Sequence, residues 1–235
     1  MLAVMAWTVP PHKPIEQHET NLWRVEASMK SPPLERVMTI AKLSTGGLVL
    51  HSVVALDDAQ MAELESFGPV KFIVVPNGWH RLDAAGYKAR YPEARVLAPK
   101  ASRKKVDQIV KVDGTLEELV DRDVKLGLVE GTRGLEAMMT VTSGDRVTLV
   151  FTDVIFNMPH RTGFQGFVLK HVMSSSGGPK VTRIGRTFLI RDKQAFAAQL
   201  EQLAAQNVTR IVVAHNEVIS VNPAGVLRGI AASMR

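Results

Sequence analysis

The most informative segment of this chain reads Val75-Pro-Asn-Gly-Trp-His-Arg-Leu-Asp83. The apolar run from Val70 to Val75 leads into it, and a helix-like segment follows it. Two more apolar runs end in polar residues in the same way, at Asp153 and at His215. In α/β proteins the side chains that bind ligands lie at the ends of strands. The three strand ends therefore offer His80, Asp153 and His215, which are metal ligands by residue type.

The length and composition are those of an ordinary globular protein. Of the 235 residues, 46% are hydrophobic and 22% are charged, so we expect a sizeable core. No apolar stretch approaches the ~18 residues of a membrane span, and the apolar start lacks the basic segment of a signal peptide. The chain has no cysteine, which excludes disulfides and thiolate ligands. We expect a cytoplasmic protein with no membrane partner and with an undetermined small-molecule substrate or ligand.

The formal net charge of +6 permits acidic partners. The densest basic cluster, Lys100-Ala-Ser-Arg-Lys-Lys105, is short, and no aromatic residue is interleaved with it to stack on bases. We interpret the cluster as a solvated surface, so a nucleic-acid partner is not expected.

The first half of the chain alternates strands with helices. Residues 1–20 read as an N-terminal arm with little regular structure, because they hold three prolines and no apolar period. Strands are then expected at 21–25, 38–43, 48–54, 70–75 and 95–98. Helices are expected from about residue 58 to 67 and from 83 to 90. This order predicts a mostly parallel sheet in this half.

The second half has a different pattern. Its expected strands are 125–129, 137–141, 147–152 and 208–214. Ser143-Gly144-Asp145 reads as a hairpin turn between two of them. Residues 157–187 read as a long loop, and an amphipathic helix is expected from 193 to 206. Asn222-Pro223 predicts the start of a terminal helix, with asparagine as N-cap and proline at the first helical position.

The order of these elements and the residues at the strand ends resemble the metallo-β-lactamase superfamily. Gly47-Leu-Val-Leu-His-Ser52 and Gly68-Pro-Val-Lys-Phe-Ile-Val-Val-Pro-Asn77 are most similar to an uncharacterised subgroup of it. The resemblance implies an α/β fold, an αββα sandwich of two mixed sheets flanked by helices. It covers residues 21–235 as a single domain and implies a metal site at one edge.

The metal motif of that superfamily is heavily altered in this chain. The first motif, H-x-H-x-D-H, would place its ligands at Asn77, Trp79, Arg81 and Leu82, and His80 falls one position out of register. Glu130-Gly-Thr-Arg-Gly134 has no histidine where the superfamily has one. Asp153 and His215 match the bridging aspartate and the last histidine. These matches imply at most one divalent ion (zinc, iron or manganese), held by His80, Asp153 and His215.

Several residues around this set have two interpretations. Arg81 could pair with Asp153 and replace the metal as its partner, and His80 could simply bond to backbone. His51 reads as a core histidine, with a supporting role at the site as the alternative. His160 could join the site, and Trp79 could line a pocket or cover the strand end. Asp83 reads as a helix cap.

Three functional hypotheses follow. The first is a hydrolase that acts on an ester, lactone or phosphoester through one metal ion. The second is a metal-free binding or assembly module on the same fold. The third and weakest, suggested by the positive charge alone, is a nucleic-acid-associated protein.

Overall fold

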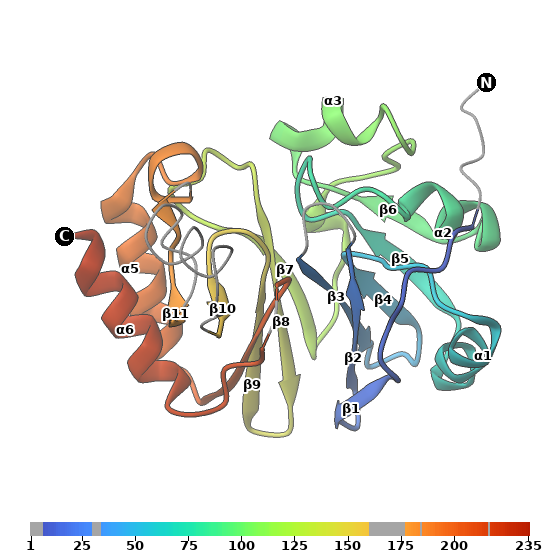
Figure 1. Cartoon of the computed structure of the whole chain (residues 1–235), viewed down its shortest axis with the longest axis horizontal. Coiled ribbons are helices and arrows are strands. Elements are labelled where there is room, and N and C mark those ends of the chain that lie inside the picture. Colours follow the sequence, from blue (N-terminus) through green and yellow to red (C-terminus); the bar gives the residue numbers. More distant parts are fainter. Residues whose placement is uncertain (1–6, 30–33, 160–176, 184, 216) are drawn as a thin grey trace, which may run out of the picture.

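Two β-sheets lie face to face in the middle of the molecule, and helices cover the outer face of each sheet (Figure 1). Helices α1 (Asp58–Phe67) and α2 (Ala84–Arg90) flank one sheet, and α5 (Lys193–Ala204) and α6 (Pro223–Met234) flank the other. The predicted αββα sandwich is confirmed. The structure, a computed structural model, describes residues 7–29, 34–159, 177–183, 185–215 and 217–235.

The first sheet has the strand order β1-β2-β3-β4-β5-β6. Its strands are β1 (Glu16–Glu19), β2 (Leu22–Ser28), β3 (Glu35–Lys42), β4 (Leu48–His51), β5 (Val70–Val74) and β6 (Arg95–Leu97). Neighbours from β1 to β4 are antiparallel, whereas β4, β5 and β6 are parallel. The expected parallel sheet is therefore correct only for residues 48–97, where α1 and α2 connect successive strands.

The second sheet has the order β12-β9-β8-β7. Its strands are β7 (Val124–Leu128), β8 (Ala137–Ser143), β9 (Arg146–Phe151) and β12 (Val208–Val213). The predicted hairpin is confirmed, because Ser143 pairs with Arg146 and Gly144 has a φ of +66°. Strand β12 is parallel to β9, whereas β8 is antiparallel to both of its neighbours. Both sheets are therefore mixed.

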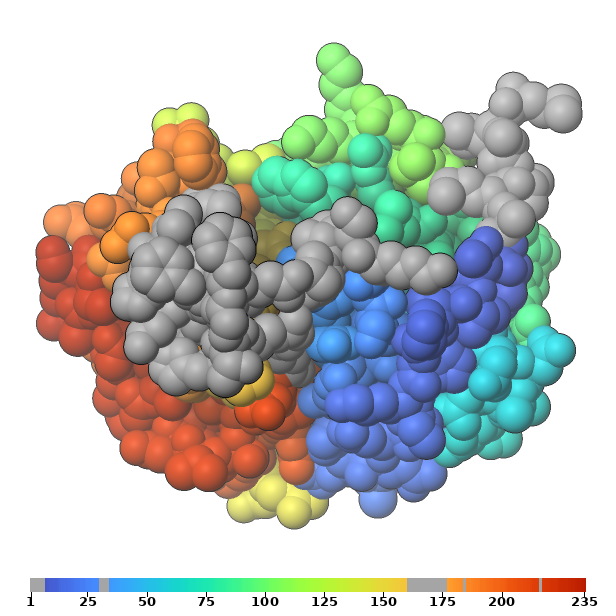
Figure 2. All heavy atoms as spheres, viewed as in Figure 1, coloured from blue at the N-terminus to red at the C-terminus, as the bar shows by residue number. Residues whose placement is uncertain are grey.

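The core has three apolar layers. The middle layer lies between the sheets and contains Val49 and Val74 from the first and Val150 and Val212 from the second. The outer layers lie between each sheet and its helices. This arrangement follows from the pleat, which turns successive side chains of a buried strand to opposite faces. In Figure 2 the half coloured blue to green and the half coloured yellow to red lie against each other.

The N-terminal segment is more regular than the sequence suggested. Residues 16–19, assigned to an irregular arm, form β1 and pair with β2. Further upstream, the Trp7 indole donates to the carbonyl of Leu56 at 3.0 Å and packs 5.0 Å from the Tyr87 ring. Much of the arm is thus fixed to the first sheet and its helices. That residues 21–235 fold as one unit stays a prediction.

Asp57, Asp83 and Asn222 each stand at the N-cap position of a helix. Asp57 caps α1 by accepting from Gln60 N at 2.9 Å, and Asn222 caps α6 by accepting from Gly225 N at 3.1 Å. Asp83 stands at the N-cap position of α2 as expected, but its carboxylate pairs with Arg36 at 2.8 Å and makes no cap hydrogen bond.

The expected long loop at 157–187 contains regular structure where it is described. β10 (Phe156–Met158) pairs with β11 (Gly178–Lys180), and a helical turn, Gly185–Leu189, follows. Residues 160–176 and 184 of that segment lie outside the described residues. In the described part of the chain, no helix has the length and apolar character needed to cross a membrane.

Candidate metal site

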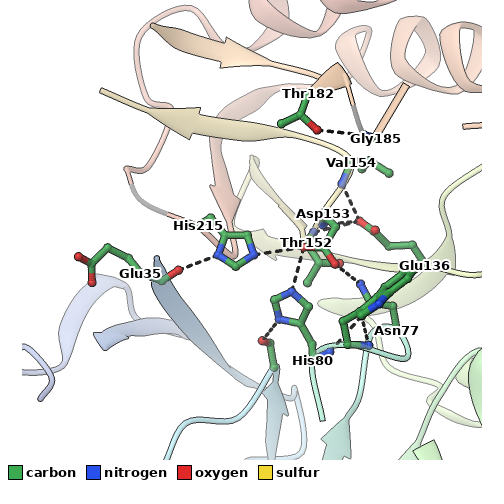
Figure 3. A network of polar contacts seen from close by, with 12 residues as sticks. Glu35, Asn77, His80, Glu136, Thr152, Asp153, Val154, Thr182, Gly185 and His215 are labelled. Atoms are coloured by element: carbon green, nitrogen blue, oxygen red, sulfur yellow. Dashed lines mark hydrogen bonds and ion pairs between the residues drawn. The ribbon is translucent and has the colours of Figure 1, made fainter. Parts of the chain in front are cut away.

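The three predicted ligand residues lie together at one edge of the sandwich (Figure 3). His80 comes from the loop after β5, Asp153 is the second residue after β9, and His215 is the second residue after β12. The carboxyl ends of the parallel strands β9 and β12 lie side by side, and the loop after β5 reaches them from the opposite sheet. One ligand atom from each residue lies within 4.8 Å of the other two. The set could therefore hold one metal ion.

Asp153 is the centre of the group. Its Oδ1 lies 3.0 Å from Nε2 of His80 and 3.1 Å from Nε2 of His215. Burial would raise the pKa of Asp153, but the charge of His80 and hydrogen bonds from His215 and His80 outweigh burial and hold the pKa well below its usual range. The carboxylate is therefore ionised, as a metal ligand must be.

Both imidazoles are held through their other nitrogen. Nδ1 of His215 lies 2.7 Å from the carbonyl oxygen of Glu35, which can only accept, so Nδ1 carries a proton. Nδ1 of His80 lies 2.8 Å from Oγ of Ser52, and Phe156 stacks on the His215 ring at 5.0 Å. In both rings Nε2 is turned toward Asp153. Metal-binding histidines are commonly oriented in this way, through a hydrogen bond to the nitrogen that does not bind the ion.

Asn77 fixes the loop that carries His80. The residue is fully buried, and its Nδ2 donates to Oδ2 of Asp153 at 2.8 Å. Its Oδ1 accepts from the backbone N–H groups of Trp79 and His80 at 2.9 and 3.1 Å. In the alignment that the sequence resemblance implies, Asn77 takes the place of the first histidine of the motif. Here it joins the carboxylate to the loop through hydrogen bonds.

Glu136 supports the site and was not predicted from the sequence. It lies just before β8 with no exposed surface, and its Oε1 accepts from the backbone N–H groups of Thr152, Asp153 and Val154 at 3.1, 3.0 and 3.3 Å. Burial, together with the charge of Asp153, raises the pKa of Glu136 to about 8. A single carboxyl group thus holds the turn that presents Asp153. In the sequence, this supporting role is indicated only by the position of one glutamate at the start of the apolar run Ala137–Met139.

The remaining predicted residues lie around this group. His51 is buried, as expected of a core histidine, and burial, with a smaller effect of the charge of His80, lowers the pKa of His51 to about 3. Its Nε2 has no hydrogen-bond partner among the described residues. Trp79 is 53% exposed and lies under the Lys105 ammonium. His160 falls outside the described residues.

The predicted pair between Arg81 and Asp153 is wrong. The Arg81 guanidinium donates to the carbonyl of Lys105 and, at 2.9 Å, to Oε1 of Gln108. Both oxygens of Asp153 are taken by the two histidines and Asn77. The physical reason is the conformation of the loop. Asn77 accepts hydrogen bonds from two successive N–H groups, and in this conformation His80, and not Arg81, faces Asp153.

Comparison with known proteins identifies the fold. The sequence matches no protein-family model and no curated protein. The structure is similar to the DIM-1 metallo-β-lactamase exposed to ceftazidime, with a TM-score of 0.63 and 9% identity over 97% of this chain and 100% of that chain. It is similar to a metallo-β-lactamase from Hirschia baltica, with a TM-score of 0.58 and 11% identity over 93% and 98%. This chain therefore has the metallo-β-lactamase fold.

A third similar structure bears on the number of metal ions. It is the metallo-β-lactamase FIM-1 from Pseudomonas aeruginosa in its mono-zinc form, with a TM-score of 0.60 and 12% identity over 97% of this chain and 98% of that chain. At such identities the likeness shows the fold alone. The fold nevertheless includes a protein that was crystallised with a single zinc ion.

Proposed function

We propose that this protein is a hydrolase that uses one divalent metal ion, with His80, Asp153 and His215 as its ligands. The observation that carries the proposal is the convergence of both Nε2 atoms on one oxygen of Asp153, at 3.0 and 3.1 Å. Two imidazoles and one carboxylate suit zinc, iron or manganese. The structure of FIM-1 in its mono-zinc form, which shares the fold, supports a single-ion site.

The charges and hydrogen bonds of the site fit a cation. Nδ1 of His215 is committed to a carbonyl, so Nε2 of the neutral ring would turn a lone pair toward an ionised carboxylate. That arrangement is repulsive unless a proton or a cation lies between the two atoms. A metal ion would replace the proton, because metal binding at such ligands releases protons.

Each residue then has a distinct part. A bound ion would polarise a carbonyl or phosphoryl oxygen and activate water for attack on it. The chain itself supplies the positions: Asn77 and Glu136 hold Asp153, while Ser52 and the Glu35 carbonyl hold the imidazoles. The substrates that fit this chemistry are esters, lactones and phosphoesters. We retain a cytoplasmic location as part of the proposal.

A metal-free binding or assembly module is the second candidate. Its support is that the same three side chains can satisfy one another when the histidines are protonated, as a buried His–Asp–His group. In that case the protein would act through binding at its surface, and the His–Asp–His group would only stabilise the fold.

Metal analysis separates the two candidates. Protein purified without chelators or a histidine tag should contain roughly one zinc, iron or manganese per chain, or bind one on addition. His215→Ala should lose the ion, whereas His12→Ala, a histidine outside the group, should keep it. Esterase, lactonase and phosphodiesterase screens would follow. Protein that contains no metal and binds none would contradict the hydrolase and favour the module.

A further inference from the structure

The loop that carries His80 also presents an aromatic and a cationic side chain. Trp79 and Arg81 flank the buried His80, and Trp79 is 53% exposed. From this arrangement we infer that the substrate carries an oxyanion group, a carboxylate or a phosphate, which Lys105 and Arg81 bind beside the Trp79 ring. The inference rests on the proposed function, because it assigns the substrate class of the same site.

The side chain of Lys105 lies against this loop. Its Nζ lies 4.7 Å from the centre of the Trp79 ring, a cation–π distance. Its stem passes over Gly78, where an added Cβ would meet Cδ of Lys105 at 2.7 Å. A larger residue at position 78 would have to displace this stem, and Gly78 therefore lets Lys105 lie beside the loop that supplies His80.

The positive charge at this place is not neutralised by the protein. Within the ranges that the structure describes, Arg81, Lys104 and Lys105 form no ion pair. The acidic residues nearest to them in sequence are already paired with other arginines: Asp83 with Arg36 at 2.8 Å and Asp107 with Arg103 at 3.4 Å. Uncompensated cations beside a site attract anions and raise their local concentration. The donors available here, an ammonium and a guanidinium, are those that bind carboxylate and phosphate oxygens.

The test uses small ligands that share a ring and differ in charge. Benzoate, phenyl phosphate and neutral benzamide would be titrated calorimetrically into the whole protein at low salt, with and without zinc. We expect one or both anions to bind more tightly than benzamide. Lys105→Met keeps the stem and removes the charge, and it should weaken anion binding by about fivefold. The matched control, Lys125→Met, removes one charge from β7 and should have no such effect.

A second variant displaces Lys105 without changing any charge. Gly78→Ala places a methyl group against the Lys105 stem and should weaken anion binding to a similar degree. Equal binding of benzamide and the anions, an equal loss in the two lysine variants, or no binding at millimolar concentration would overturn the inference. Much tighter binding of a single-stranded oligonucleotide would also overturn it, in favour of a nucleic-acid surface.

Failure of the anion subsite and failure of the metal site give different results in these experiments. Lys105 contacts none of the three metal ligands through a hydrogen bond, so Lys105→Met should bind zinc as the unaltered protein does. Zinc binding without anion preference would reject the inference alone. Lys105-dependent anion preference without zinc binding would reject the metal site and retain the anion subsite.

Discussion

The two ends of the sandwich each join the sheets through one acidic side chain, but with different basic partners. At the site edge, Asp153 lies between His80 and His215. Near the turns at the other end, Glu19 lies between Arg146 at 2.6 Å and Arg210 at 3.0 Å. Arginine does not release its proton, whereas histidine does so near neutral pH. The arginines beside Glu19 therefore stay charged, whereas in the proposed function the Asp153 group exchanges a proton for a metal ion.

The largest expected difference comes from removing each acid in turn. Asp153→Ala should lower zinc affinity by more than about 100-fold. Removing a residue that only supports a metal ligand lowers affinity by roughly 10- to 100-fold, and removing the ligand itself should lower it further. Glu19→Ala should leave zinc affinity unchanged and lower the free energy of unfolding by about 1–3 kcal/mol. Isothermal titration and urea unfolding measure the two quantities. Equal loss of zinc in both variants would remove the distinction between the two ends.

Removing Glu136 should affect both stability and the site. Glu136→Ala leaves three backbone N–H groups without their acceptor, which costs about 3 kcal/mol, and should weaken zinc binding roughly tenfold. Glu136→Gln keeps a hydrogen-bond acceptor at the same place, so it should retain most of the stability and most of the zinc affinity. Zinc binding is measured far below each melting temperature, so that only folded protein is compared. A Glu136→Ala protein with unaltered zinc affinity would show that the turn holds its shape unaided.

The pH dependence of stability should also depend on Glu136. A free glutamate ionises near 4.5, whereas the pKa of Glu136 is raised to about 8 in the folded chain. Between about pH 4.5 and 8 the folded chain holds a proton that the unfolded chain has released, so this group makes stability fall as pH rises. Glu136→Gln should flatten the curve in that window. The free energy of unfolding would be measured by urea unfolding at several pH values. If it changes with pH as steeply in Glu136→Gln as in the unaltered protein, the pH dependence comes from other groups.

The smallest effect is expected at Arg81. Since Arg81 does not pair with Asp153, Arg81→Ala should change the free energy of unfolding by less than about 0.5 kcal/mol. Zinc affinity should stay that of the unaltered protein. A marked rise in zinc affinity would instead indicate that the guanidinium repels a cation at the site.

The order of the elements, through its resemblance to the metallo-β-lactamase superfamily, predicted the fold, and the strand ends predicted the three converging residues. Buried runs that end in His80, Asp153 and His215 mark strand ends, and parallel strands bring such ends to one edge. The supporting contacts do not follow such patterns. The partner of His215 is a backbone carbonyl, at Glu35, and Glu136 acts from a turn before β8. The alignment to a family motif misled at Arg81, because the hydrogen bonds of Asn77 decide which side chains of the loop face inward.

The separation of the site residues along the chain has a kinetic consequence. Asp153 is 73 residues from His80 and 62 residues from His215, and the three come from both sheets. The group can therefore form only when the two halves have docked, late in folding. An ion that binds only the assembled protein stabilises the native state and not the folding transition state. We expect zinc to leave the rate of refolding unchanged and to act almost wholly by slowing unfolding.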